Sequence, residues 1–305
     1  MESRNYTVIC LSEAISPITH ASGSSGNESI VMREEIPTSR GTIAVPVLSG
    51  NALRHRAIRE PGWRWLIGQY ELAGKLNLAQ LNFGLHGGNL TEGGGRENTR
   101  RIADFQRIFP LGRLVGGTIP DQILAGSLHT WRGLLVCEEN RQTLETILPG
   151  GLLPAKRLRA AESFISGWQY TRSDAAKTAT DLRPTDLTTD SPSNLMIFSG
   201  QSVMRGSLFV HGFSLPHVSE FELGALLWSL QLWQAAGGTI GGQASRGHGR
   251  LKTAILTDDW DGDAAVNAYL GHARAAQDEA VAWLTEVFGA ASSERTASRK
   301  KGVKA

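Results

Sequence analysis

The sequence predicts a mixed α+β fold in which strands and helices follow one another without regular alternation. Short apolar runs that end at proline or glycine, such as Tyr6–Ile15, are typical of buried strands. Other runs repeat apolar residues every three to four positions, as amphipathic helices do. The helices are too few, and the polar stretches too long, for a doubly wound parallel sheet. We therefore expect an α+β protein with large polar excursions.

The N-terminal part contains two predicted strands and two predicted helices. A polar stretch, Thr19–Arg40, follows the strand Tyr6–Ile15; its glycines and charges predict an irregular, ligand-facing excursion. Thr42–Leu48 is a second extended segment. The next helix covers Asn51–Glu60, and Pro61 starts another because proline disrupts a helix interior.

The middle of the chain alternates between polar and apolar segments. Leu76–Leu114 is rich in glycine and polar residues, and we expect an insertion without regular elements, outside the core. Gly126–Glu138 is a predicted strand, and Arg141–Leu148 is a short helix. Ala155–Asn194 has few large apolar residues after Trp168, which predicts a solvent-exposed arm.

The C-terminal part returns to regular structure. Met196–Leu215 predicts two strands bent at a glycine. Ser219 and Glu222 form a capping-box pattern that starts an apolar helix. The strand Arg250–Leu256 follows, and one further helix begins at Asp261.

Bulk composition restricts the class of protein. The formal net charge is only +2, but 24 of the 31 basic residues are arginine. The planar guanidinium group can bind phosphate and stack on nucleobases, although GC-rich coding would also explain a high arginine content.

The cysteines and the apolar runs indicate the compartment. Cys10 and Cys137 lie far apart in apolar runs, which predicts buried, reduced thiols. With neither a signal-peptide pattern nor a membrane-length apolar run, we expect a cytoplasmic protein without a membrane partner.

The sequence GGQASRGHGRLK, between the apolar helix and the last strand, is the first candidate binding site. Its glycines allow close backbone approach to a ligand, and its basic side chains can donate to phosphate. It lacks the Gly-Lys-Ser/Thr of a nucleotide-binding loop. A flexible connection is an equally weighted alternative. The candidate binding residues in this loop are Gly242, Arg246, Gly247, His248 and Arg250.

A second basic cluster surrounds the start of the helix that follows Leu48. Free backbone N–H groups at a helix start favour an anion. A regular helix places Asn51 and Arg54 on one face and Arg56 on another. An ordinary solvated helix face is the alternative. The candidate binding residues here are Ser49, Asn51, Arg54 and Arg56, together with Arg40 of the polar excursion.

Enzyme functions have weaker support. The eight histidines show no zinc-ligand spacing, and no Gly-x-Ser-x-Gly motif is present. We expect neither a metal nor a cofactor. Glu28, Glu34 and Glu35 could act as a base or metal ligand in RNA cleavage, but surface carboxylates are usually only solvated. An enzyme acting on a small phosphate-bearing ligand is a third alternative.

Three segments together resemble the RAMP superfamily of CRISPR-associated proteins, especially its Cas seven-like backbone subunits. Val45–Arg56 is similar to the family's proline- and serine-containing stretch that leads into a basic helix. Gly241–Arg250 closely resembles its late glycine loop. Ser163–Asn194, followed by MIFSGQSVMRGSLF, looks like its thumb hairpin and the strand after it. Leu76–Leu114 and the final helix do not align with the family pattern.

The resemblance implies a ferredoxin-like palm, also called an RNA-recognition-motif fold, with an inserted finger region and a thumb hairpin. It implies that repeated copies of the protein assemble along a guide RNA (crRNA). It also implies two further kinds of partner, namely target DNA or RNA and other CRISPR-associated subunits. Arg172 of the arm becomes a further candidate RNA contact. The expected parts are 1–60, the first part of the palm; 61–125, a helical finger insertion; 126–154, palm; 155–195, the thumb arm; 196–288, palm with a C-terminal helix; and 289–305, a disordered basic tail.

One departure from the family bears on catalysis. RNA-cleaving relatives carry a catalytic aspartate in the first loop, where this chain has Gly26-Asn27-Glu28-Ser29. The resemblance therefore favours a non-cleaving backbone subunit, as in a type IV or type I system. Type III-like cleavage of target RNA through Glu28 is the alternative.

Overall fold

Four antiparallel strands form the palm in the computed structural model, which describes residues 3–25, 28–38, 41–90, 98–148, 150–154, 158–171, 197–257 and 259–289. They are β1 (Arg4–Ala14), β9 (Gly133–Leu135), β12 (Leu208–Val218) and β13 (Leu251–Ile255), in the order β13-β1-β12-β9. A stretch that contains helices α1–α5, described below, separates β1 from β9, and α8 (Glu220–Ala235) separates β12 from β13. In chain order the sheet is 4-1-3-2 of a βαββαβ unit, the ferredoxin-like arrangement. The predicted α+β class and palm are confirmed.

Three more strands extend the palm sheet. β5 (Gly41–Leu48) pairs with β9, β4 (Arg33–Thr38) pairs with β5, and the short β8 (His129–Thr130) pairs with β12. The single strand predicted for Gly126–Glu138 is therefore two short ones.

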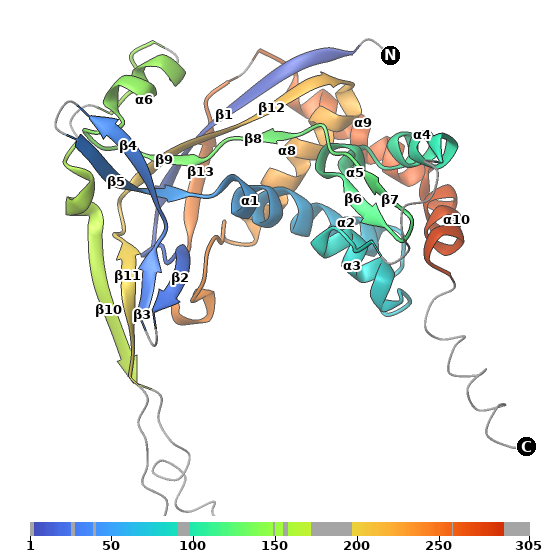
Figure 1. The fold of residues 1–305 in the computed structure, drawn as a ribbon. Helices are drawn as coiled ribbons and strands as arrows, with labels where there is room; N and C mark the ends of the chain where they lie inside the picture. The colour runs from blue at the N-terminus through green and yellow to red at the C-terminus, as the bar shows by residue number, and fades with distance from the viewer. Residues whose placement is uncertain are drawn as a thin grey trace, which may run out of the picture.

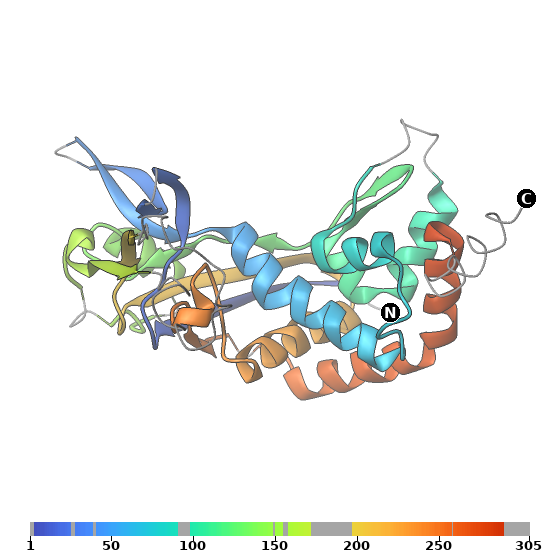
Figure 2. The same ribbon diagram turned by 90° about the horizontal axis from the view of Figure 1, so that it is seen from below.

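The helix α8 lies along one face of the palm sheet (Figures 1 and 2), and both faces of the sheet contribute buried apolar residues. Val8 and Cys10 of β1 pack toward the helices, whereas Ile9 packs toward α6 (Arg141–Ile147) on the opposite face. This explains why β1 is a nearly continuous apolar run. Cys10 and Cys137 are both buried free thiols, as predicted.

A second sheet has the strand order β10-β11-β3-β2. The bounds of its strands are β10 Ile165–Thr171, β11 Ile197–Val203, β3 Glu28–Val31 and β2 Ala21–Ser25. β10 and β11 are antiparallel up to Thr171 and Ile197, so they form the base of the predicted thumb hairpin. Residues 172–196 of that arm lie outside the described residues.

The irregular excursion predicted for Thr19–Arg40 is wrong, because this stretch contains β2, β3 and β4. β3 pairs in parallel with β11, more than 160 residues further along the chain. Strand pairing supplied by distant segments stabilises residues whose local sequence is polar and rich in serine.

The first helix continues through Pro61, contrary to the predicted break. It comprises α1 (Gly50–Leu53), a π-helical segment η1 (Arg54–Arg59) and α2 (Glu60–Gln69). The widened turn carries an i to i−5 hydrogen bond, from the Glu60 N–H to the His55 carbonyl. Such a turn suits a following proline, which has no amide hydrogen to donate.

The insertion also differs from its prediction, because it contains regular elements that contribute to the core. They are α3 (Leu78–His86), α4 (Thr99–Ile108), α5 (Pro110–Val115), β6 (Gly117–Ile119) and β7 (Gln122–Leu124). An Asn77 capping box starts α3, and Phe83 and Phe105 are each 1 % exposed. Buried aromatic side chains, not glycine content, determine how this segment packs.

The described residues that follow β12 contain three α-helices. The predicted Ser219–Glu222 capping box is present at the start of α8 (Glu220–Ala235). Two helices, α9 (Gly262–Ala275) and α10 (Gln277–Phe288), replace the single one predicted after Asp261. The tail from 290 lies outside the described residues. Within the described ranges, no helix has the length and apolar character needed to span a membrane.

Candidate nucleic-acid interface

The glycine loop between α8 and β13 is fastened along the segment that follows β1. The amide of Gly242 donates to the Thr19 carbonyl at 2.8 Å, and that of Gly249 to the Pro17 carbonyl at 2.7 Å. The Arg250 amide donates to Ser16 Oγ at 2.9 Å. These bonds hold the loop against residues 16–19.

Two glycines of the loop lie too close to neighbouring backbone for any other residue. Gly241 and Gly249 have positive φ angles of 74° and 83°. A Cβ atom at Gly241 would lie 2.4 Å from the Thr19 carbonyl oxygen, and one at Gly249 would lie 2.3 Å from that of Ile240. Gly241 and Gly249 therefore allow the loop to pack closely against the protein's own backbone. Gly242 and Gly247, in contrast, are exposed to solvent.

Arg246, on the short 3-10 turn η5 (Ala244–Arg246), lies over an aromatic ring of the second sheet. Its guanidinium carbon is 4.0 Å from the ring centroid of Tyr170 on β10. Gln243 holds both partners, since its amide oxygen accepts from Arg246 Nη1 and its Nε2 donates to the Tyr170 hydroxyl at 3.5 Å. The arginine is nevertheless exposed. A cation that is both oriented and exposed is well suited to bind phosphate.

Tyr170 belongs to a ladder of parallel aromatic rings on β10 and β11, formed by Trp168, Tyr170 and Phe198. The ring centroids of Trp168 and Tyr170 are 5.3 Å apart, and the angle between the ring planes is 7°. For Tyr170 and Phe198 the centroid distance is also 5.3 Å, and the interplanar angle is 19°. Gly200 faces Trp168, where a Cβ would lie 2.6 Å from the indole. All three aromatic residues are partly exposed.

This ladder was not predicted from the sequence. Its signal was present, because Trp168 and Tyr170 are two positions apart, the spacing that puts side chains on one face of a strand. Nucleobases stack on such exposed aromatic rings in single-stranded nucleic-acid sites.

His248 joins the loop to both the ladder and residue 19. Its Nδ1 atom lies 2.7 Å from the Thr19 hydroxyl, and its ring meets the Trp168 indole edge-on at 6.0 Å. Burial lowers the pKa of His248 below its usual value of 6.5. The neutral imidazole therefore supports the loop through hydrogen bonding and packing.

The start of α1 adjoins the same segment. Ser49 caps the helix by accepting from the Ala52 amide at 3.1 Å, and its own amide donates to His20 Nε2 at 3.0 Å. Burial lowers the pKa of His20, consistent with an imidazole nitrogen that accepts a hydrogen bond. Asn51 is exposed beside this cap. The helix start, residues 16–20, the glycine loop and the aromatic ladder thus form one connected surface.

Arg54 turns toward the protein instead of joining this surface. Its guanidinium donates to the Val115 carbonyl, and buried Arg59 donates to the same oxygen at 2.7 Å and to Gly116 at 2.9 Å. Burial lowers the pKa of both arginines, that of Arg59 to about 10. The π-helical turn brings residues five apart together, so the faces expected from a regular helix do not hold here.

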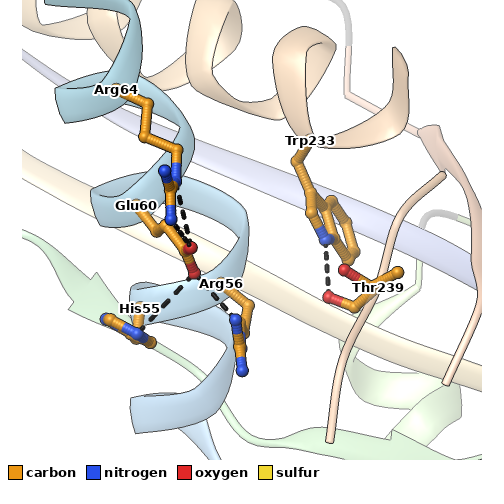
Figure 3. Close-up of polar contacts among 6 residues, drawn as sticks. All are labelled: His55, Arg56, Glu60, Arg64, Trp233 and Thr239. Atoms are coloured by element: carbon orange, nitrogen blue, oxygen red, sulfur yellow. Dashed lines mark hydrogen bonds and ion pairs between the residues drawn. The ribbon is translucent and has the colours of Figure 1, made fainter. Parts of the chain in front are cut away.

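Arg56 is exposed but ion-paired within its own helix (Figure 3). The Glu60 carboxylate binds Arg56 at 2.8 Å and Arg64 at 2.9 Å, with the His55 ring at 3.8 Å.

A tryptophan of α8 supports the beginning of the glycine loop. Figure 3 shows the Trp233 indole donating to the Thr239 carbonyl, and the distance is 2.9 Å. Thr239 pairs with Arg250, so this bond fixes the beginning of the glycine loop.

The remaining candidates are two arginines and two glutamates outside the loop and the first helix. Arg40 and Arg172 lie outside the described residues. Glu28 is exposed at the start of β3, opposite Ser199. Glu34 pairs with Arg132 at 2.8 Å. Among the described side chains, no group of three His, Cys, Asp or Glu residues is arranged to hold a metal ion.

The strand order defines this chain as an α+β protein with a ferredoxin-like palm. No protein-family model matches the sequence, and neither does any curated protein. The fold matches a chain in the solved structure of a Type IV-B CRISPR complex, with a TM-score of 0.57 and 16% sequence identity. The match covers 84% of this chain and 93% of that chain. The two chains share their fold over nearly their whole length.

Proposed function

We propose that this protein is a backbone subunit of a CRISPR ribonucleoprotein effector complex. It binds the phosphate backbone of the guide RNA, assembles in several copies along it with other CRISPR-associated subunits, and presents it for pairing with target DNA or RNA. The fold shared with a chain of a Type IV-B CRISPR complex supports this assignment.

The observation that carries the proposal is the position of the Arg246 guanidinium over the ring of Tyr170, the middle member of the aromatic ladder. Arg250 is exposed in the same loop. Arginines beside partly exposed aromatic rings bind a single strand through its phosphates and bases together. A site for a small phosphate ligand alone has no need of three stacked rings.

The test is binding of a fluorescein-labelled single-stranded RNA by the full chain, followed by fluorescence anisotropy at several salt concentrations. R246A/R250A removes two exposed cations, so we expect weaker binding and a salt slope shallower by about 1 to 2. The matched control R100A/R274A removes two exposed helical arginines and leaves binding unchanged. Equal binding by both double variants would contradict the proposal.

We further propose a role without cleavage. Glu28 is an exposed strand residue, and the Glu34 carboxylate forms an ion pair with Arg132. Target RNA paired to the guide should stay intact when the complex is incubated with divalent metal. Regularly spaced cuts that disappear in E28A would establish the nuclease alternative instead.

A further inference from the structure

A groove of about 410 Å³ lies where the palm meets the base of the β10–β11 hairpin, outside the surface described above. Its floor is apolar, formed by Val136, Phe164 and Leu208. Its rim carries charge, from Arg159, Arg205 and Glu13. The groove therefore combines buried apolar side chains with charged edges.

Arg159 repeats the geometry of Arg246. Its guanidinium carbon is 4.8 Å from the ring centroid of Phe164, which is itself only 5 % exposed. Arg159 is exposed. One face of the guanidinium thus rests on a buried ring, while the exposed remainder can stack on a further planar group.

Arg205 supplies a second exposed cation, at the turn between β11 and β12. Gly206 follows it with a φ of 86°, and a Cβ there would meet nothing within 4 Å, so the rim is open at this point. The acidic member of the rim, Glu13, lies directly opposite Lys252 in the strand register. The basic charge therefore dominates around the groove.

The groove and the glycine loop are both connected to the C-terminal end of β1. The Gly206 amide donates to the Ala14 carbonyl at 2.7 Å, and the next amide, that of Ile15, donates to the Arg250 carbonyl at 2.9 Å. The β11–β12 turn and the glycine loop thus flank the same end of β1. A strand bound at Arg250 needs to pass only this end to reach the groove.

We propose that the groove binds one nucleotide of a single-stranded nucleic acid. The base stacks on the Arg159 guanidinium above Phe164, and the phosphate contacts Arg205. This inference rests on the proposed function and adds a second contact point to it. A planar base joined to an anion matches an exposed guanidinium that is held over an aromatic ring beside a second cation, whereas an anion alone has no use for the stacking face.

The test uses the full chain, the same labelled single-stranded RNA and three variants. R159A/R205A is expected to bind roughly tenfold more weakly, with a shallower salt slope, because it loses both the stacking group and the phosphate contact. R159K keeps the charge but not the planar group, so its affinity falls while its salt slope stays unchanged. The control is again R100A/R274A, and thermal melting confirms that each variant is folded.

The outcomes separate the two proposals. Binding by R159A/R205A that equals the control, or binding by R159K that equals the unmodified chain, overturns the groove assignment. In that case, loss of binding in R246A/R250A leaves the proposed function standing. If R246A/R250A also binds like the control, both proposals fail.

Discussion

The imidazole of His211 is fully buried in the centre of the palm sheet. Its Nε2 atom lies 2.8 Å from the Ser12 hydroxyl, which in turn lies 2.7 Å from that of Thr253. This polar line crosses three neighbouring strands, β12, β1 and β13, beneath the helices. Burial lowers the pKa of His211 from 6.5 to about 4, so the folded protein holds the ring neutral.

The depressed pKa of His211 predicts a loss of stability in mild acid. Below pH 6.5 His211 becomes protonated in the unfolded chain, whereas in the folded chain it becomes protonated only at about pH 4. The free energy of unfolding should therefore fall by up to about 3 kcal/mol across this interval. Urea unfolding at a series of pH values measures the fall.

H211Q should flatten that pH dependence, because it removes the titrating group, even if it lowers stability at pH 7. H129Q, at an exposed histidine, serves as the matched control and should keep the slope of the unmodified chain. An H211Q profile as steep as that of H129Q would contradict the assignment.

At the scale of elements, the π-helical segment η1 determines which arginines face solvent. Arg54 and Arg59 meet on the Val115 carbonyl at the end of α5, while Arg56 points to Glu60. The first pair closes the C-terminal end of a buried helix, where carbonyl groups lack partners. η1 therefore joins the first palm helix to the insertion.

We expect R59A to lower the free energy of unfolding by about 3 kcal/mol, because it removes charged donors from two buried carbonyls. R56A should cost less than about 1 kcal/mol, since its ion pair is exposed. R54A should also reduce stability while leaving the salt slope of RNA binding unchanged. Urea denaturation and anisotropy measure the two effects; an R54A slope as shallow as that of R246A/R250A would place Arg54 on the RNA.

How far the sequence predicts these elements depends on where their partners lie. β1 and the α8 capping box were predictable because their signals are local: an apolar run and a Ser-x-x-Glu pattern. β3 was not, since it is stabilised by pairing with β11, far along the chain. The glycine loop was identified from its composition, but the inward turn of Arg54 depends on a π-turn that a regular helical period cannot show.

At the scale of the whole molecule, the insertion and the palm helices share one core. Phe105 of α4 lies 5.8 Å from Phe83 of α3 and 5.4 Å from Trp283 of α10, measured between ring centroids. Trp63 of α2 lies 5.7 Å from Phe83. The first palm helix, the insertion and the final helix therefore meet in a single aromatic cluster, so these parts are not expected to fold independently.

The shared core predicts that damage in the insertion spreads to the palm. F105A removes a ring that is 1 % exposed and should cost about 3 to 5 kcal/mol. Because the cluster links α4 to α2, amide hydrogen exchange should quicken in the palm strands β1 and β12 as well as in α3 and α4. F209A, at a fully buried ring on β12, provides the reciprocal variant and should quicken exchange in the insertion helices. Faster exchange confined to the mutated part in both variants would mean that palm and insertion unfold separately, and that the aromatic cluster does not couple them.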